Sequence, residues 1–471
     1  MQLLAALDAA MMTAEVLASP LNIGVVLVMS RPPDTGPHFL DELHSADLAG
    51  RFPLDSRLRR HPHRGIETAG MWIWRTAGAV DLARHCRRQT LPPGSGRDQL
   101  WQLISELHAE PLDRSRPMWM SYLIDGFDDQ RFAVYVKVHH TLMDGLAGIH
   151  MITAALSPDP DSRAMAPFYA EADSPVPGAP TPAADAITGR PSASLLSVPH
   201  VAAQSVSFLE RLLTSEAATL LRSVATKTTQ FPVSAPCTRF NGAVGHRLGV
   251  ASGTWPKGRF SAVHHPAGVT TNDVITAVVG GVLRRWLQER DELPARSLVA
   301  ICPITVRPRG VDGDKPTGNQ FGAWLVPLGT DIADADERLD LIHRVMAEGK
   351  HRVAERGSAV SMSLLATSIA ATVLSPVVPI PLKPRTGYNL PVSHISGPSH
   401  EMYWNGAHVE EIVPVSAVYD GQALNVTTCS YADRIHFGYV AGRHAVPDIE
   451  ALVPLTEECL REVEEGRPRS R

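Results

Sequence analysis

The stretch Val138–Gly148, VHHTLMDGLAG, follows two adjacent histidines with three other residues and then an Asp-Gly pair. The residues that lead into it, RFAVYVKVHH, alternate between two sets of side chains, and a β-strand turns such sets toward opposite faces. His139 and His140 then point apart, so a shared metal ion is not expected, and no third ligand stands at a metal-like spacing. The next residues, DGLAGIHMITAAL, are typical of a helix with Asp144 near its N-terminus. The stretch therefore predicts a strand, a tight turn and a helix within an α/β fold.

Such a turn can hold a reactive side chain at the edge of a cleft, and histidine exchanges a proton near neutral pH. The alternative is structural: one histidine packs in the core, the other is solvated, and Asp144 only caps the helix. A second pair, His264-His265, has no Asp-Gly after it and precedes PAGVTTND, so we interpret that pair as structural. The four fixed residues of the first motif favour catalysis, but a short motif needs support from the rest of the chain.

The bulk composition excludes several classes of protein. The chain has 471 residues and a net charge of −5, so a nucleic-acid-binding surface is not indicated. Its five cysteines are scattered without a Cys-x-x-Cys pair, which argues against a disulfide framework or a zinc ribbon and fits the cytoplasm. The first eighteen residues lack a basic region, so a secretory signal is not expected. A chain of this length predicts two domains.

A segment rich in Pro, Ala, Ser and Asp, residues 158–199, predicts a linker, and a helical stretch at about residues 201–226 follows it. We therefore divide the chain into an N-terminal domain (residues 1–160), a linker with a connecting helix (161–235) and a C-terminal domain (236–471). The histidine motif falls near the end of the N-terminal domain.

Both domains mix strands with helices, which indicates an α/β (mixed α+β) architecture. Residues 119–140 predict two strands around a turn, and residues 297–306 and 423–440 predict further strands. Residues 270–290 predict a helix with Thr271 or Asn272 as its N-cap. Its apolar face consists of Ile275, Val278, Val279, Val282, Leu283 and Trp286.

The stretch Ala359–Leu382 contains no charged residue and is long enough to span a bilayer. Serines and threonines dilute it, and Pro376, Pro379 and Pro381 interrupt its end. We expect a buried or surface-lying helix rather than a membrane span. Packing in the core is the preferred interpretation, and docking on a membrane or lipid droplet is the alternative.

Several further motifs surround the histidine motif in a recognisable order. The chain resembles the bacterial wax ester synthase/diacylglycerol acyltransferase family over nearly its whole length, and most closely the actinobacterial triacylglycerol synthase branch. The resemblance rests on these blocks: LAALDAAMM, VDLARHCRRQTLPPGSGRDQLWQLISELHAEPLDRSRPMW, TTNDVITAVVGGVLRRWL, TGNQFGAWLVPL, HISGP and ALNVTTCSYADRIHFGYV.

The resemblance implies a fold similar to the CoA-dependent acyltransferases, with two domains and a channel between them that contains the motif. It implies transfer of a long-chain acyl group from acyl-CoA, a substrate rather than a cofactor, to the hydroxyl of diacylglycerol or of a long-chain alcohol. By family position, His140 resembles a general base, His139 its neighbour, Asp144 an orienting residue and Gly145 a residue that shapes the turn. Candidate oxyanion donors by the same criterion are Asn272, Asn319 and Ser393, although capping or turn roles are equally expected for each.

The sequence departs from the family pattern at Thr141, where Ala or Ser is common, and at Met120, where an acidic residue is frequent. These departures leave acyl and acceptor specificity open. Two other functions stay open: a carrier-protein-dependent condensation or acetyl transfer, and a non-catalytic lipid-binding or lipid-droplet protein. We expect a cytoplasmic enzyme, with peripheral association at the inner membrane or a lipid droplet left open.

Overall fold

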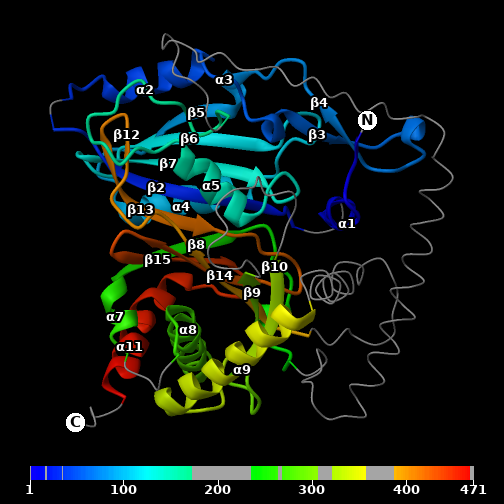
Figure 1. Ribbon diagram of the computed structural model, residues 1–471, viewed down its shortest axis with the longest axis vertical. Coiled ribbons are helices and arrows are strands. Elements are labelled where there is room, and N and C mark those ends of the chain that lie inside the picture. Colours follow the sequence, from blue (N-terminus) through cyan, green and yellow to red (C-terminus); the bar gives the residue numbers. More distant parts are fainter. Residues whose placement is uncertain are drawn as a thin grey trace.

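The computed structural model describes residues 2–15, 19–33, 35–171, 235–263, 268–305, 321–356 and 387–466. Two six-stranded sheets lie one above the other, helices cover the lower face of the lower sheet, and α4 (Arg97–Ala109) lies between the sheets, against β8 (Leu248–Pro256) and β2 (Asn22–Ser30) (Figure 1). The predicted α/β architecture is confirmed, because each half of the chain contributes both strands and helices.

The upper sheet in Figure 1 consists largely of N-terminal strands. Its order is β12 (Tyr403–Trp404), β13 (Ala407–Val415), β2 (Asn22–Ser30), β7 (Arg131–His139), β6 (Trp119–Asp125) and β5 (Cys86–Thr90). The helices of this half are α1 (Ala6–Glu15), α2 (Phe39–Leu48), α3 (Leu82–His85), α4 (Arg97–Ala109) and α5 (Gly145–Ala154), with the 3-10 turn η1 (Ser56–Arg59). The two strands predicted around the turn at Gly126 are thus β6 and β7.

The lower sheet is built from the C-terminal half. Its order is β10 (Phe321–Pro327), β9 (Val299–Thr305), β11 (Leu390–Ser396), β14 (Leu424–Tyr431), β15 (Arg434–Gly442) and β8 (Leu248–Pro256). Its helices and 3-10 turns are α7 (Lys257–Ser261), α8 (Thr271–Gln288), α9 (Ala335–Arg356), α11 (Leu452–Glu465), η3 (Arg239–Asn241) and η4 (Ile449–Ala451). A small third sheet contains β1 (Gln2–Leu3), β4 (Ile73–Thr76) and β3 (Arg60–His63), with η2 (Ile66–Thr68) between β3 and β4.

Two C-terminal strands, β12 and β13, belong to the N-terminal sheet, and β13 is the one that pairs with an N-terminal strand. β13 pairs with β2 from His408↔Ser30 to Val415↔Gly24, with a register shift between Val409 and Glu411. A division of the chain at residue 236 therefore does not separate the two sheets. The crossing strand β13 joins the two halves, and β2 separates it from β7, which carries the histidine motif at its end.

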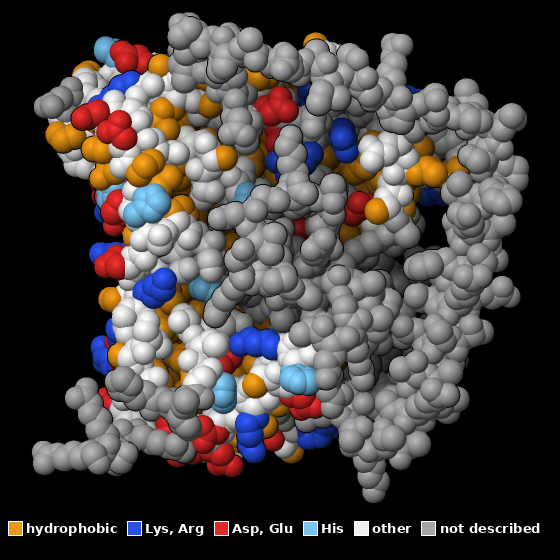
Figure 2. All heavy atoms as spheres, in the orientation of Figure 1, with side chains coloured by type: hydrophobic (Ala, Val, Ile, Leu, Met, Phe, Trp, Pro, Cys, Tyr) orange, Lys and Arg blue, Asp and Glu red, His pale blue; other side chains and the backbone are white. Residues whose placement is uncertain are grey.

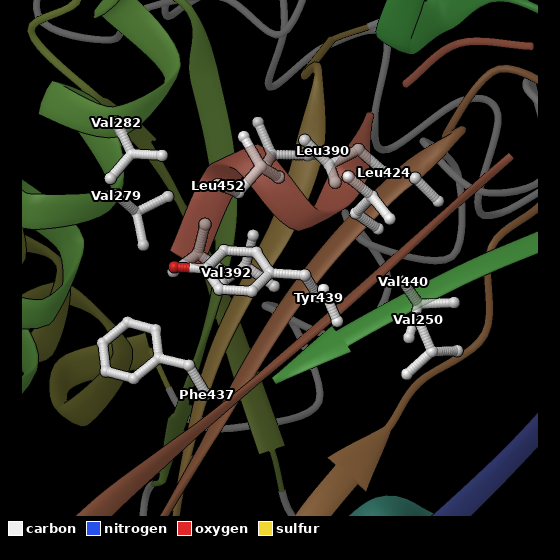
Figure 3. Packing of buried hydrophobic residues seen from close by; sticks show 14 of the residues in the cluster. Val250, Val279, Val282, Leu390, Val392, Leu424, Phe437, Tyr439, Val440 and Leu452 are labelled. Atoms are coloured by element: carbon white, nitrogen blue, oxygen red, sulfur yellow. The ribbon is translucent and has the colours of Figure 1, made fainter. Parts of the chain in front are cut away.

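The main hydrophobic core fills the space between the lower sheet and its helices and extends to α4 and to residues of β2, β6, β7 and β13 in the upper sheet. Figure 3 shows Phe437 and Tyr439 of β15 pointing toward α8, which contributes Val279 and Val282. All six side chains of the predicted apolar face of α8 are buried, so that prediction is confirmed. The lower sheet and its helices thus pack in the same core as the upper sheet, which carries the motif.

The N-terminus of α8 differs from the prediction by one residue. Its N-cap is Thr270, whose hydroxyl accepts from the amide of Asp273, while the Asp273 carboxylate accepts from the amide of Thr270 at 2.9 Å. This reciprocal capping box satisfies two helix-end donors, which neither Thr271 nor Asn272 could do from inside the first turn.

Some sequence predictions fall outside the described residues, namely those on His264-His265, Asn319, the helix at 201–226 and the stretch Ala359–Leu382. Within the described part of the chain, no helix is long and apolar enough to cross a membrane.

Candidate active site

The histidine motif begins where β7 ends. Hydrogen bonds to neighbouring segments of the protein hold the backbone of both histidines. The His139 amide donates to the Met118 carbonyl at 3.0 Å, and the His140 amide donates to the Leu21 carbonyl at 3.0 Å. β7 lies between β2 and β6 in the sheet, so this end of the strand is fixed on both sides. The position of His140 is therefore set by the backbone of three strands.

His139 is buried, with only 1% of its side chain exposed. Its Nδ1 accepts from the Thr141 amide at 3.2 Å and lies 2.7 Å from the Thr141 hydroxyl. Because a backbone amide can only donate, Nδ1 is the acceptor of this bond, which leaves Nε2 to carry a ring hydrogen. Nε2 donates to Glu15 Oε2 at 2.9 Å. His139 is thus fixed in one tautomer and one orientation.

Glu15, at the end of α1, is the second important residue of this network. Its Oε2 also accepts from Arg114 at 2.9 Å, and its Oε1 accepts from the Leu21 amide at 3.3 Å. Burial favours the neutral acid, but the hydrogen bond from His139 and the charge of Arg114 outweigh it and hold the pKa of Glu15 below its usual range. Since the Leu21 carbonyl accepts from the His140 amide, Glu15 holds both sides of the turn around His140.

Sequence reasoning did not select Glu15. The only available signal was a single charged residue between Ala9 and Ala18, in the otherwise uncharged stretch AAMMTAEVLA. A buried carboxylate needs a partner, and here that partner is 124 residues away in the chain.

His140 has very different surroundings. Its side chain is half-buried, and its imidazole makes no hydrogen bond to another residue in the described part of the chain. Burial lowers the pKa of His140, and the nearby Asp144 carboxylate opposes that shift in part. The imidazole is therefore neutral at pH 7 and has a nitrogen available to accept a proton.

Asp144 is the N-cap of α5, as the sequence predicted. Its Oδ1 accepts from the Ala147 amide at 2.7 Å. A larger residue would fit at either glycine in the first turn of α5. A Cβ on Gly145 would lie 3.5 Å from Ile395 Cδ1, and one on Gly148 would meet nothing within 4 Å.

The contact with Ile395 shows what lies opposite the motif, namely β11 of the lower sheet. Ser393 is two residues before Ile395, so strand alternation places it on the same face of β11, and its side chain is half-buried. Asn272 is the second residue of α8, and no described contact joins it to the motif. Of the three candidate oxyanion donors, the structure brings Ser393 to the side of the motif.

A group of buried polar side chains between the sheets also escaped the sequence analysis. His108 Nδ1 lies 2.7 Å from the Tyr135 hydroxyl, and its Nε2 lies 3.3 Å from the Ser416 carbonyl. The Tyr135 ring lies across β2, where a Cβ on Gly24 would come within 2.6 Å of it. The Ser416 hydroxyl lies 2.8 Å from that of Thr427, which pairs with Ser393. These groups form a polar network among the side chains between the two sheets.

A cavity of about 1160 Å³ lies between α4 and β8, and residues of both halves line it. Trp101 and Ser105 contribute from α4, and Val250, whose amide donates to the Ser105 hydroxyl at 2.9 Å, contributes from β8. The motif residues are not part of its lining. The cavity therefore lies between the two halves, and His140 does not line it.

Two stacked mixed sheets joined by a crossing strand, with a His-His-x-x-x-Asp-Gly turn between them, define a two-domain acyltransferase and condensation-domain fold. The starter condensation domain of rhizomide synthetase RzmA has this fold, with a TM-score of 0.55 and 14% identity over 99% of this chain and 94% of that chain. A wax ester synthase/diacylglycerol acyltransferase from Marinobacter aquaeolei VT8 is more similar, with a TM-score of 0.75 and 28% identity over 99% of both chains.

The sequence comparisons define the family. The profile of the wax ester synthase/diacylglycerol acyltransferase catalytic domain matches residues 4–275, and that of the family's C-terminal domain matches residues 317–464. A Mycobacterium tuberculosis protein named "Putative diacyglycerol O-acyltransferase" is 36% identical, over 98% of this chain and 90% of its own. Another from the same organism, named "Probable diacyglycerol O-acyltransferase", is 32% identical over 95% of both chains. The chain therefore belongs to the wax ester synthase/diacylglycerol acyltransferase family and is an acyltransferase of that type.

Proposed function

We propose that this enzyme transfers a long-chain acyl group from acyl-CoA to a diacylglycerol hydroxyl, with a long-chain alcohol as the second possible acceptor, and that His140 is the general base. The observation that supports this role most directly is the contrast within the motif. The His139 ring is occupied at both nitrogens, whereas the neutral His140 ring makes no hydrogen bond to another described residue. Only His140 is free to accept a proton.

In the proposed reaction, His140 takes the proton of the acceptor hydroxyl while the oxygen attacks the thioester carbonyl carbon. The carbon–sulfur bond of the resulting tetrahedral intermediate then breaks, an ester forms, and the protonated His140 returns its proton to the CoA thiolate. No protein nucleophile and no cofactor takes part. Among the oxyanion donors, Ser393 is our first candidate because its strand faces the motif, while Asn272 and Asn319 rest on family position alone.

The names of the Mycobacterium tuberculosis relatives favour diacylglycerol as the acceptor. The test is to give purified enzyme a labelled acyl-CoA with dioleoylglycerol, with hexadecanol, or with both, and to separate the products by thin-layer chromatography. We expect labelled triacylglycerol as the main product. Exclusive formation of wax ester would contradict the choice of acceptor, and no ester with either acceptor would contradict the function.

The role of His140 is tested by His140→Ala, with His150→Ala as the matched control, because His150 is an exposed histidine on the adjoining helix α5. Loss of a general base should reduce the rate by about 100-fold or more, while the fold persists. The control should keep the wild-type rate. Near-normal activity of His140→Ala would contradict the assignment.

A further inference from the structure

Exposed large hydrophobic side chains are few in the described part of the chain, and three of the four gather in one place. Leu3 (43% exposed), Ile66 (99%) and Met71 (38%) belong to the small sheet β1–β4–β3 or to the loop at its end, and the fourth, Leu48, lies on α2. Elsewhere in this part of the chain such side chains are buried or half-buried, so the cluster is not a general feature of the surface. An exposed apolar cluster of this kind marks an interaction site.

The register of the small sheet places these side chains at one end of it. We call residues 60–76, with β3, η2 and β4, the arginine hairpin. Its last paired row is His63↔Ile73, and Leu3 pairs with the same Ile73 from the other side. Beyond that row the loop closes on itself, because the Gly70 amide donates to Gly65 at 3.0 Å. Ile66 therefore projects from the tip of the hairpin, and Leu3 borders it.

The hairpin is basic although the whole chain has a net charge of −5. It contains three arginines and one acidic residue, Glu67, which pairs with Arg75 and His63. Arg64 lies over the Trp72 ring, 5.7 Å from its centroid. Figure 2 shows hydrophobic side chains beside basic ones at the upper right corner, where Figure 1 places β3, β4 and their loop. Basic residues, tryptophan and a projecting apolar tip are the composition of a surface that docks on anionic lipid.

The inner side of the hairpin packs against the elements of the motif. The Trp72 indole donates to the Thr13 hydroxyl of α1 at 3.1 Å. Trp72 and Trp74 pack against a small core that includes Met12 of α1 and Leu142 of the motif loop. A lipid surface in contact with the tip would therefore lie next to the same helix that supplies Glu15 to the active site.

We propose that the arginine hairpin docks this enzyme on an anionic phospholipid bilayer, with Ile66 and Met71 inserted between the head groups and the arginines against the phosphates. The proposal deepens the proposed function, because a bilayer is where a water-insoluble diacylglycerol would be met. The docking itself depends only on the hairpin surface and can be measured without any reaction.

The experiment is flotation of the full-length protein with vesicles of phosphatidylcholine alone or mixed with phosphatidylglycerol. Wild-type protein should float with the anionic vesicles, and I66D/M71D should lose this binding by about tenfold or more. The matched control is Leu48→Asp, which places the same charge on the fourth exposed hydrophobic position. Ile66 is almost fully exposed, whereas Met71 is only 38% exposed, so unchanged thermal unfolding of I66D/M71D must verify that the fold persists, and Ile66→Asp alone is the variant that removes the least buried surface.

The proposal is overturned if wild-type protein floats with neither vesicle, if I66D/M71D floats like wild type, or if Leu48→Asp loses as much binding. A second copy of the chain is the competing occupant of this surface. Light scattering that shows a wild-type dimer and an I66D/M71D monomer would also overturn lipid docking. On detergent-dispersed substrates I66D/M71D should keep the wild-type rate, whereas His140→Ala should float normally without turnover. Failure of docking and failure of the proposed chemistry are thus separate results.

Discussion

His139 and His140 are adjacent in the chain but belong to different regions of the molecule. His139 contacts Glu15 of α1 through Nε2, and Thr141 of its own loop donates to Nδ1, so both ring nitrogens are occupied. His140 belongs to the half-buried turn opposite β11, where its ring makes no hydrogen bond to another described residue. The comparison separates two tasks: one histidine holds the turn in place, and the other is left available for proton transfer.

The largest test of this comparison is the difference between the two alanine variants. His139→Ala should lose clearly less activity than the roughly 100-fold expected for His140→Ala, because the base itself is still present. His139→Ala should, however, unfold at a lower temperature, since it leaves the buried Glu15 without one of its donors. Steady-state kinetics with thermal unfolding of both variants will show this. Equal losses of activity would contradict the division of tasks.

The next test removes the carboxylate charge of Glu15, which binds His139 and the Leu21 amide beside the motif turn. Glu15→Gln should lower kcat by roughly 10-fold, because a general base that is slightly misplaced transfers protons slowly, while KM changes little. The matched control is Glu42→Gln, an exposed glutamate on α2. Glu15→Asp should regain part of kcat. A fall in stability with unchanged kcat would mean that Glu15 is only structural.

A smaller effect is expected at Asp144. Asp144→Ala removes the N-cap of α5 and should cost about 1 kcal/mol of unfolding free energy, whereas Asp144→Asn keeps a capping oxygen and should cost much less. Chemical denaturation of the two variants measures this. If both lose activity far beyond what their stability loss explains, Asp144 takes part in the chemistry.

The smallest effect concerns pH. Burial lowers the pKa of His140, so the neutral, basic form predominates at pH 7, and the rate should fall only on the acid side, below the ordinary histidine pKa of about 6.5. The Asp144 carboxylate raises that pKa, so Asp144→Asn should move the acid limb of the kcat/KM profile to lower pH. A shift to higher pH would contradict the proximity of the two groups.

Local patterns were sufficient to predict the main elements of the site. The alternation of RFAVYVKVHH predicted β7, and the residues after Asp144 predicted α5 with that aspartate as its cap. These predictions succeeded because periodicity and capping involve residues only a few positions apart. The N-cap of α8 was misplaced by one residue, since all four residues of TTND (270–273) are types that serve as N-caps and only the backbone geometry selects Thr270.

The sequence by itself determined the motif, the mixed architecture and, through the order of its blocks, the family. Tertiary structure alone decided which groups meet at the motif: Glu15 with His139, Ile395 with Gly145, and β13 with β2. Such contacts join residues more than a hundred positions apart, and no local pattern encodes their pairing. The burial that leaves His140 neutral and fixes the ring of His139 exists only when those distant segments close around the end of β7.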